Sequence, residues 1–225
     1  MAYTPLRTDA APESIRDFVR LHVDMQLHDV HTMLRLPLTK ESGMDGGCNV
    51  ASVSVLCAVL AGASTVFFRQ HGPDGERFTD LLAAHYPWDS QPRGGVERSI
   101  AISAIYGRYR NPLVHALAVS TRKSGRGPAR RIVVDTQERP LGVIKQALTE
   151  EAVVALERPD GPAPSWLTPV VTSNSGGGVD LYPHSLYWGT RRTLESLFSD
   201  RALMQQTVAW FAPLAVGKAS PGERG

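Results

Sequence analysis

The feature that most constrains the fold is a long uncharged segment. Residues 50–68, VASVSVLCAVLAGASTVFF, contain no charged side chain. Such a segment must be buried in a protein core or in a bilayer, because exposing so much apolar surface to water is unfavourable. Ser52, Ser54 and Gly62 interrupt it, and no aromatic or multi-basic belt brackets both of its ends. We therefore expect a fully buried core helix and not a membrane span.

The composition fits a soluble globular protein. The chain has 225 residues, of which 42% are hydrophobic and 20% charged, and its formal net charge is +2. Bulk charge therefore does not demand a nucleic-acid partner, although a local cluster could still attract phosphate. The two cysteines, Cys48 and Cys57, have no metal-ligand spacing, and the N-terminus lacks a secretory signal pattern. These features predict a cytoplasmic protein without a metal, a cofactor or a membrane partner.

Apolar periodicity predicts several helices in the first half of the chain. We expect helices over residues 12–34, from Asn49 to about residue 68 with Asn49 as the cap, over 77–86, and from about residue 96 onward. A further helical piece is expected over residues 112–119. Five helical pieces in this region predict a helical bundle.

The pattern changes after a basic loop, residues 122–131, that contains no acid. We expect a strand over 130–136, a helix over 141–157, and a β-hairpin from 167–173 and 178–183 across the turn NSGGG. Helices over 184–198 and 201–214 should follow, with Ser199 as a cap. The predicted fold is mainly α, a helical bundle with a small α+β C-terminal region holding the hairpin. The predicted organisation is 1–121 bundle, 122–131 loop, 132–215 C-terminal part and 216–225 disordered tail.

Pro112 predicts a break in the helix that contains it. In the stretch YGRYRNPLVHALA, residues 106–118, a continuous helix would make the proline clash with the carbonyl of Arg108 and lose a hydrogen bond, at about 3 kcal/mol. Proline also disfavours α geometry at Asn111. A break at Arg110 removes both problems, because Asn111 then becomes an N-cap and Pro112 the first residue of a new helix.

The predicted break would also assemble a site. It would bring the guanidinium of Arg110, the amide of Asn111 and the imidazole of His115 together at a helix N-terminus, where free N–H groups favour an anion. Phosphate is the most natural anion for such donors, and His115 would place a titratable group beside it.

The same residues carry a resemblance to a known family. R-N-x-x-x-H, from Arg110 to His115, resembles the R-x4-6-H signature of the HEPN superfamily, whose members are helical bundles. The surrounding IYGRYRNPLVHALA resembles the tyrosine-rich helix around that motif, and GGCNVASVSVLCAVLAGAS, residues 46–64, resembles the apolar helix that precedes it. The resemblance covers roughly the first 120 residues.

The resemblance implies a metal-independent endoribonuclease that leaves a 2′,3′-cyclic phosphate and a 5′-OH. It implies Arg110, Asn111 and His115 as catalytic residues and a homodimer whose two motifs form one composite site. The partners it implies are RNA and an antitoxin or other regulatory protein. Leu117 stands where one toxin subclass carries a modified tyrosine, so that form of regulation is not implied. The predicted substrate-binding residues are Arg108, Tyr109, Arg122, Lys123 and Arg126.

Other interpretations of the sequence stay open. The chain could be a catalytically inactive HEPN-like interaction or RNA-binding protein. Cys48, placed before a helix, could form a nucleophilic pair with His115 or His184. Asp24, His28 and His31 could bind a metal ion, although a solvated helix face is the favoured interpretation of these residues. Aromatic residues of the C-terminal third could stack on bases, although core packing is favoured for them. These residues are Trp166, Tyr182, Tyr187, Trp188 and Trp210.

Overall fold

The computed structural model describes residues 12–36, 40–41, 44–45, 48–111, 141–143, 148–157 and 162–215. The protein is mainly helical, as predicted. The helices are α1 (Pro12–Arg35), α2 (Asn49–Phe67), α3 (Asp74–His85), the 3₁₀ turn η1 (Trp88–Ser90), α4 (Arg98–Ala104), the π-helix η2 (Ile105–Arg110), α6 (Glu150–Ala155), α7 (Pro183–Ser199) and α8 (Arg201–Ala215).

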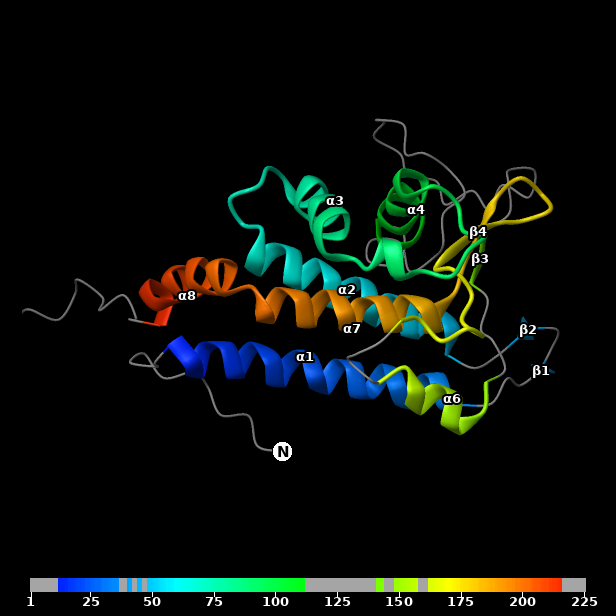
Figure 1. Ribbon diagram of the computed structural model, residues 1–225, viewed down its shortest axis with the longest axis horizontal. Coiled ribbons are helices and arrows are strands. Elements are labelled where there is room, and N and C mark those ends of the chain that lie inside the picture. The colour runs from blue at the N-terminus through cyan, green and yellow to red at the C-terminus, as the bar shows by residue number, and fades with distance from the viewer. Residues whose placement is uncertain are drawn as a thin grey trace, which may run out of the picture.

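Helix α2 is the central helix of the fold. It contacts α1, α3, α7, α8 and η2, and it runs alongside α1 and α7 (Figure 1). Its inward side chains Val53, Leu56 and Leu60 are 0% exposed. In the part of the chain that the structure describes, α2 is the one helix long and apolar enough to cross a membrane, and half of that segment is buried inside the fold. The uncharged segment therefore contributes one face to the core, but it is not the fully buried helix that the sequence predicted, because residues such as Val50, 46% exposed, and Gly62 lie on an exposed face.

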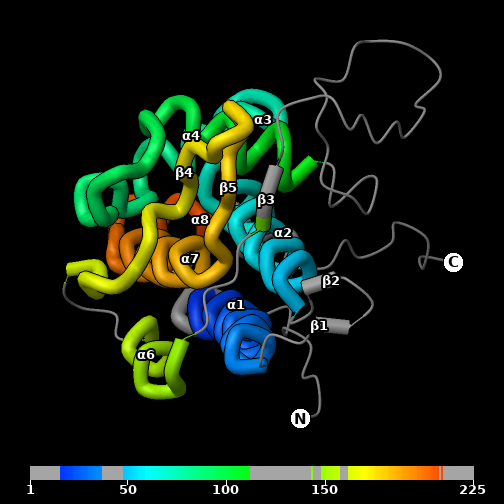
Figure 2. The backbone as a smooth tube through the Cα atoms, turned by 90° about the vertical axis from the view of Figure 1, so that its right-hand side faces the viewer, coloured from blue at the N-terminus to red at the C-terminus, as the bar shows by residue number. Residues whose placement is uncertain are grey.

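Helix α7 belongs to the same core as the N-terminal helices. Leu186, Tyr187 and Trp188 of α7 are buried in one hydrophobic cluster with Leu56 and Leu60 of α2. Figure 2 shows α7 between α1, α2 and the strands. The predicted bundle and the predicted C-terminal part therefore share one core. The predicted basic loop and tail lie outside the described residues.

The predicted hairpin is confirmed. Strands β4 (Val171–Ser173) and β5 (Val179–Leu181) pair in antiparallel fashion. The side chain of Asn174 closes the turn, because its Oδ1 accepts a hydrogen bond from the N–H of Gly178 at 2.8 Å. Gly177 has φ +73°, a conformation that favours glycine. A second small sheet pairs β1 (Lys40–Glu41) with β2 (Met44–Asp45).

The predicted helix over residues 141–157 is wrong in its first part. Residues Leu141–Val143 form strand β3, which pairs in parallel with β5 and gives the sheet order β3-β5-β4. Among the described residues of this range the helical part is α6, and the hydroxyl of Thr149 caps it by accepting from the N–H of Ala152 at 3.3 Å. Pairing with a strand far along the chain has overridden the local helical pattern. The strand predicted over 130–136 and the helix over 112–119 lie outside the described residues.

Two predicted caps are also wrong. The residue before α2 is Cys48, with φ 58° and no side-chain cap, while Asn49 is the first helical residue. At the start of α8 the cap is Asp200 and not Ser199, because the carboxylate of Asp200 accepts from the N–H of Leu203 at 3.0 Å. A carboxylate at this place also interacts favourably with the positive end of the helix dipole.

Candidate functional site

The predicted helix interruption takes a different form from the expected one. Asn111 keeps helical φ and ψ of −64° and −49°, and its N–H donates to the carbonyl of Tyr106, five residues back. Asn111 is therefore not an N-cap with extended geometry. The helix instead changes from α to π over Ile105–Arg110, immediately before Asn111 and Pro112. Such π-turns are rare and frequently occur at functional sites.

Arg110 and Asn111 are in direct contact at the end of this π-helix. Nη1 of Arg110 donates to Oδ1 of Asn111 at 2.8 Å. The guanidinium carbon lies 5.6 Å from the ring centroid of Tyr106, within the range of a cation–π interaction. The amide and the ring together fix the orientation of the guanidinium.

The charge of Arg110 has no acidic partner in the described part of the chain. Arg110 is half-buried, its Nε is buried without a hydrogen bond, and no described carboxylate lies within ion-pair distance of it. A partly buried cation without a counter-charge is unfavourable. The side chain is thus suited to receive an anion.

The nearby thiol of Cys57 on α2 is not a candidate nucleophile. Cys57 is 0% exposed, and burial raises its pKa to about 12, with the positive charge of Arg110 opposing the rise. The thiol is therefore neutral at pH 7. The π-helix η2, which carries Arg110, packs directly against α2.

Tyr109 lies in the core and connects η2 to the sheet. Its side chain is 0% exposed, and its hydroxyl donates to the carbonyl of Val179 on β5 at 3.1 Å. Burial raises the pKa of this phenol, and the nearby carboxylate of Asp180 raises it further, so it acts as a neutral donor. The burial and the hydrogen bond show that Tyr109 holds η2 on the sheet, while the expectation that it binds substrate stays a prediction.

We expect Tyr109→Phe to lower the free energy of unfolding by about 1–3 kcal/mol, since the buried hydrogen bond to the carbonyl of Val179 is lost. Urea denaturation of both proteins measures the difference. Tyr106→Phe is the matched control, because Tyr106 is only partly buried and precedes Tyr109 on the same helix. Equal stability of Tyr109→Phe and wild type would show that the hydroxyl contributes nothing to holding η2 on the sheet.

Arg108 lies on the side of η2 that faces the hairpin, where it lines a pocket with residues of α4, β4 and β5. His115 and the basic-loop residues Arg122, Lys123 and Arg126 lie outside the described residues. Of the predicted catalytic trio, the structure therefore describes Arg110 and Asn111 and brings them together.

The alternative sites predicted from sequence are not assembled among the described residues. His31 turns toward Glu157, with 3.3 Å between Nδ1 and Oε1, while His28 is exposed. The described residues contain no group of three side chains that could hold a metal ion. Cys48 is exposed, whereas His184 is 0% exposed. Of the aromatic residues, Tyr187 and Trp188 are in the core, and Trp166 is 37% exposed.

Sequence reasoning missed a polar cluster between α1, α6 and α7. His31, 7% exposed, stacks on Tyr187 with 6.3 Å between ring centroids. Arg191 donates from Nη1 to the hydroxyl of Tyr187 at 3.4 Å and from Nη2 to the carbonyl of Glu157 at 3.2 Å. No sequence spacing could have revealed this cluster, because its members come from three separate segments.

Stability should fall as the pH is lowered through the range where histidines titrate. Burial lowers the pKa of His31, against the opposing effect of Glu157 and with smaller lowering by Arg35, His28 and Arg191. Burial also lowers the pKa of His85, against the opposing effect of Asp200. The unfolded chain, whose histidines have a pKa of about 6.5, therefore binds protons first as the pH falls.

The stability that the folded protein gains by keeping His31 and His85 neutral is fully present above a pH of about 6.5. It is lost as the pH falls toward the lower pKa values of these histidines in the folded state. Urea unfolding at pH 7.5 and at pH 5.5 measures it, and we expect the lower free energy of unfolding at pH 5.5. A His31→Gln, His85→Gln double variant should show a weaker pH dependence. An unchanged pH dependence in that variant would contradict the assignment to these two side chains.

The comparisons with known proteins give no assignment. No family model, curated protein or solved structure matches the chain.

Proposed function

We propose that this protein is a metal-independent endoribonuclease of the HEPN type, which cleaves RNA through attack by the substrate's own 2′-OH. The observation that supports the proposal is the state of Arg110, a half-buried guanidinium held by Asn111 and Tyr106 without an acidic partner among the described residues. A phosphodiester would supply the missing negative charge.

In the proposed reaction, Arg110 stabilises charge on the phosphoryl oxygens. A guanidinium has five N–H donors, and Arg110 uses one of them to bind Oδ1 of Asn111. Its planar fork matches two phosphate oxygens, and a donor fixed before the reaction stabilises developing charge without reorganisation. Asn111 orients the guanidinium through the same hydrogen bond.

His115 is proposed as the acid–base residue. It would take the proton of the 2′-OH as the 2′-oxygen attacks phosphorus, or give a proton to the departing 5′-oxygen. The 2′-O–P bond forms and the P–O5′ bond breaks, which leaves a 2′,3′-cyclic phosphate and a 5′-OH. DNA lacks the nucleophile and should not be cleaved.

One chain supplies one such histidine, whereas in-line cleavage benefits from an acid and a base on opposite sides of the phosphate. We therefore propose a homodimer with a composite site, acting in the cytoplasm, with an antitoxin or other regulatory protein as a further partner. Sedimentation equilibrium at micromolar concentration should show the dimer. A purely monomeric protein would contradict the composite site.

The function is tested by incubating the purified protein with mixed RNA and with DNA in EDTA. We expect RNA fragments with 2′,3′-cyclic phosphate and 5′-OH ends, and intact DNA. Intact RNA at high concentrations of folded, dimeric protein would overturn the nuclease proposal. If the same protein still retained RNA in a gel-shift assay, the non-catalytic RNA-binding alternative would be favoured.

A further inference from the structure

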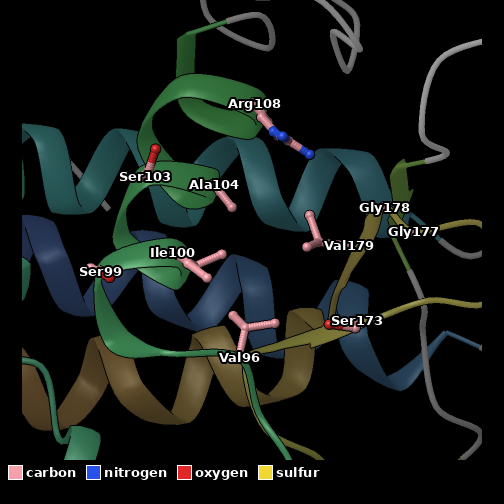
Figure 3. A pocket seen from close by; sticks show the side chains of 10 residues that line it. All are labelled: Val96, Ser99, Ile100, Ser103, Ala104, Arg108, Ser173, Gly177, Gly178 and Val179. Carbon is pink, nitrogen blue, oxygen red and sulfur yellow. The ribbon is translucent and has the colours of Figure 1, made fainter.

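A pocket lies between α4 and the β4–β5 hairpin, on the hairpin side of η2. Its volume is about 360 Å³. Figure 3 shows α4 and η2 on one side of it and the hairpin residues Ser173, Gly177, Gly178 and Val179 on the other. Neither Arg110 nor Asn111, the two described residues of the proposed cleavage site, lines this pocket.

Arg108 is the only charged side chain among the described residues that line the pocket. Its guanidinium extends from η2 toward Val179 and the glycines of the turn (Figure 3). Arg108 is half-buried, and no described carboxylate lies within ion-pair distance of it. The acid on the adjoining strand, Asp180, accepts instead from Nδ2 of Asn174 at 3.1 Å and does not line the pocket.

The remaining lining combines hydrogen-bonding and apolar groups. The hydroxyls of Ser99, Ser103 and Ser173 come from α4 on one side and β4 on the other. Gly177 and Gly178 have no side chains and so allow a ligand to approach the backbone of the turn closely. Ile100, which is 48% exposed, and Val96 provide apolar surface between these polar groups.

This lining fits a ligand with a polyoxygen anion at one end and an apolar surface at the other. A phosphate offers several acceptor oxygens, which can be shared between a guanidinium on one wall and hydroxyls on both walls, whereas a carboxylate offers only two. The volume lies at the lower end of the range for small-molecule sites, about 300–1,000 Å³. A guanidinium that has no ion-pair partner among the described residues, and no acid in the described lining, also favours a negatively charged ligand.

We propose that the pocket between α4 and the hairpin binds a nucleotide, with the phosphate on Arg108 and the base against Ile100 and Val96. The same phosphate chemistry is present in a free nucleotide and in one nucleotide of an RNA chain. The proposal does not depend on the ribonuclease activity.

The test measures binding of AMP, of inorganic phosphate and of a 2′-O-methylated RNA oligonucleotide to the whole protein by isothermal titration calorimetry in EDTA. The methylated RNA lacks the nucleophile of the proposed cleavage, so its binding is measured without turnover. Arg108→Gln should weaken AMP binding by roughly tenfold to a hundredfold, because it removes a charge-assisted hydrogen bond. Arg98→Gln is the matched control, since Arg98 is exposed on α4 and does not line this pocket.

A free nucleotide is supported as the ligand if AMP binds wild type, if Arg108→Gln weakens this binding, and if Arg98→Gln leaves it unchanged. If the methylated RNA binds but AMP does not, and if Arg108→Gln alone weakens the RNA binding, the ligand is a nucleotide within an RNA chain. Ser173→Trp, which fills the pocket from the exposed end of β4, provides the second variant if Arg108→Gln does not fold. If neither AMP nor the methylated RNA binds wild type, or if neither pocket variant weakens binding, the proposal is overturned.

Discussion

Arg110→Ala is expected to reduce RNA cleavage in EDTA by roughly a hundredfold to a thousandfold, the usual cost of removing one fixed donor from a site that stabilises developing charge. The substitution removes the guanidinium that Asn111 and Tyr106 hold in place. The measurement is the initial rate of fragment formation at saturating RNA, where a loss in kcat separates transition-state stabilisation from weaker substrate binding.

Two further variants give this prediction its controls. Arg110→Lys keeps the charge but loses the planar fork, so its rate should stay well below that of wild type. Arg98→Ala should cleave at the wild-type rate, because Arg98 is an exposed arginine of the preceding helix with no role in the proposed site. Cleavage by Arg110→Ala at the wild-type rate, with the fold intact, would remove the basis for the proposed function.

Gly189→Ala is expected to destabilise the fold by about 1–3 kcal/mol, the range for overpacking a core. A Cβ at this position of α7 would lie 2.2 Å from both Cζ and the hydroxyl oxygen of Tyr86. Tyr86 is 4% exposed, and its hydroxyl donates to the carbonyl of Ser185 at 3.2 Å, so the ring has little freedom to move away. Denaturation in urea measures the loss.

Gly62→Ala is the matched control for this substitution. Gly62 also lies within a helix, α2, but a Cβ there would have no atom within 4 Å. Alanine has the higher helix propensity, so Gly62→Ala should raise the free energy of unfolding by up to about 1 kcal/mol. The two glycine variants should therefore shift stability in opposite directions. A shift of the same sign and size in both would show that the close approach of α7 to Tyr86 is not needed for stability.

Local sequence patterns predicted much of the helical structure. The apolar faces of α1, α3, α7 and α8 and the uncharged run of α2 each lie within one segment, and the turn residues between β4 and β5 are adjacent in sequence. Strand β3 was missed for the opposite reason, because Leu141–Val143 is defined as a strand by its pairing with β5 far along the chain. The cluster of His31, Tyr187 and Arg191 was missed for the same reason, because its residues come from segments that are far apart in the sequence.

For the candidate site, the sequence identified the place but not the form of the irregularity. Proline at position 112 predicted a disturbed helix around Arg110, and a π-helix ends there. Whether Tyr109 faces solvent or core depended on where β5 lies, and its contact with Val179 could not be read from the motif. The pocket beside Arg108 likewise needs α4 and the hairpin to come together.

The sequence by itself determined that α2 needs a buried apolar face, that the chain is mainly helical, and that a guanidinium and an amide stand next to each other before a proline. These are properties of residues that are neighbours in the chain. Only the tertiary structure decided which charges lack partners among the described residues and which tyrosines are in the core, because burial and counter-charges depend on segments that meet only when the chain has folded.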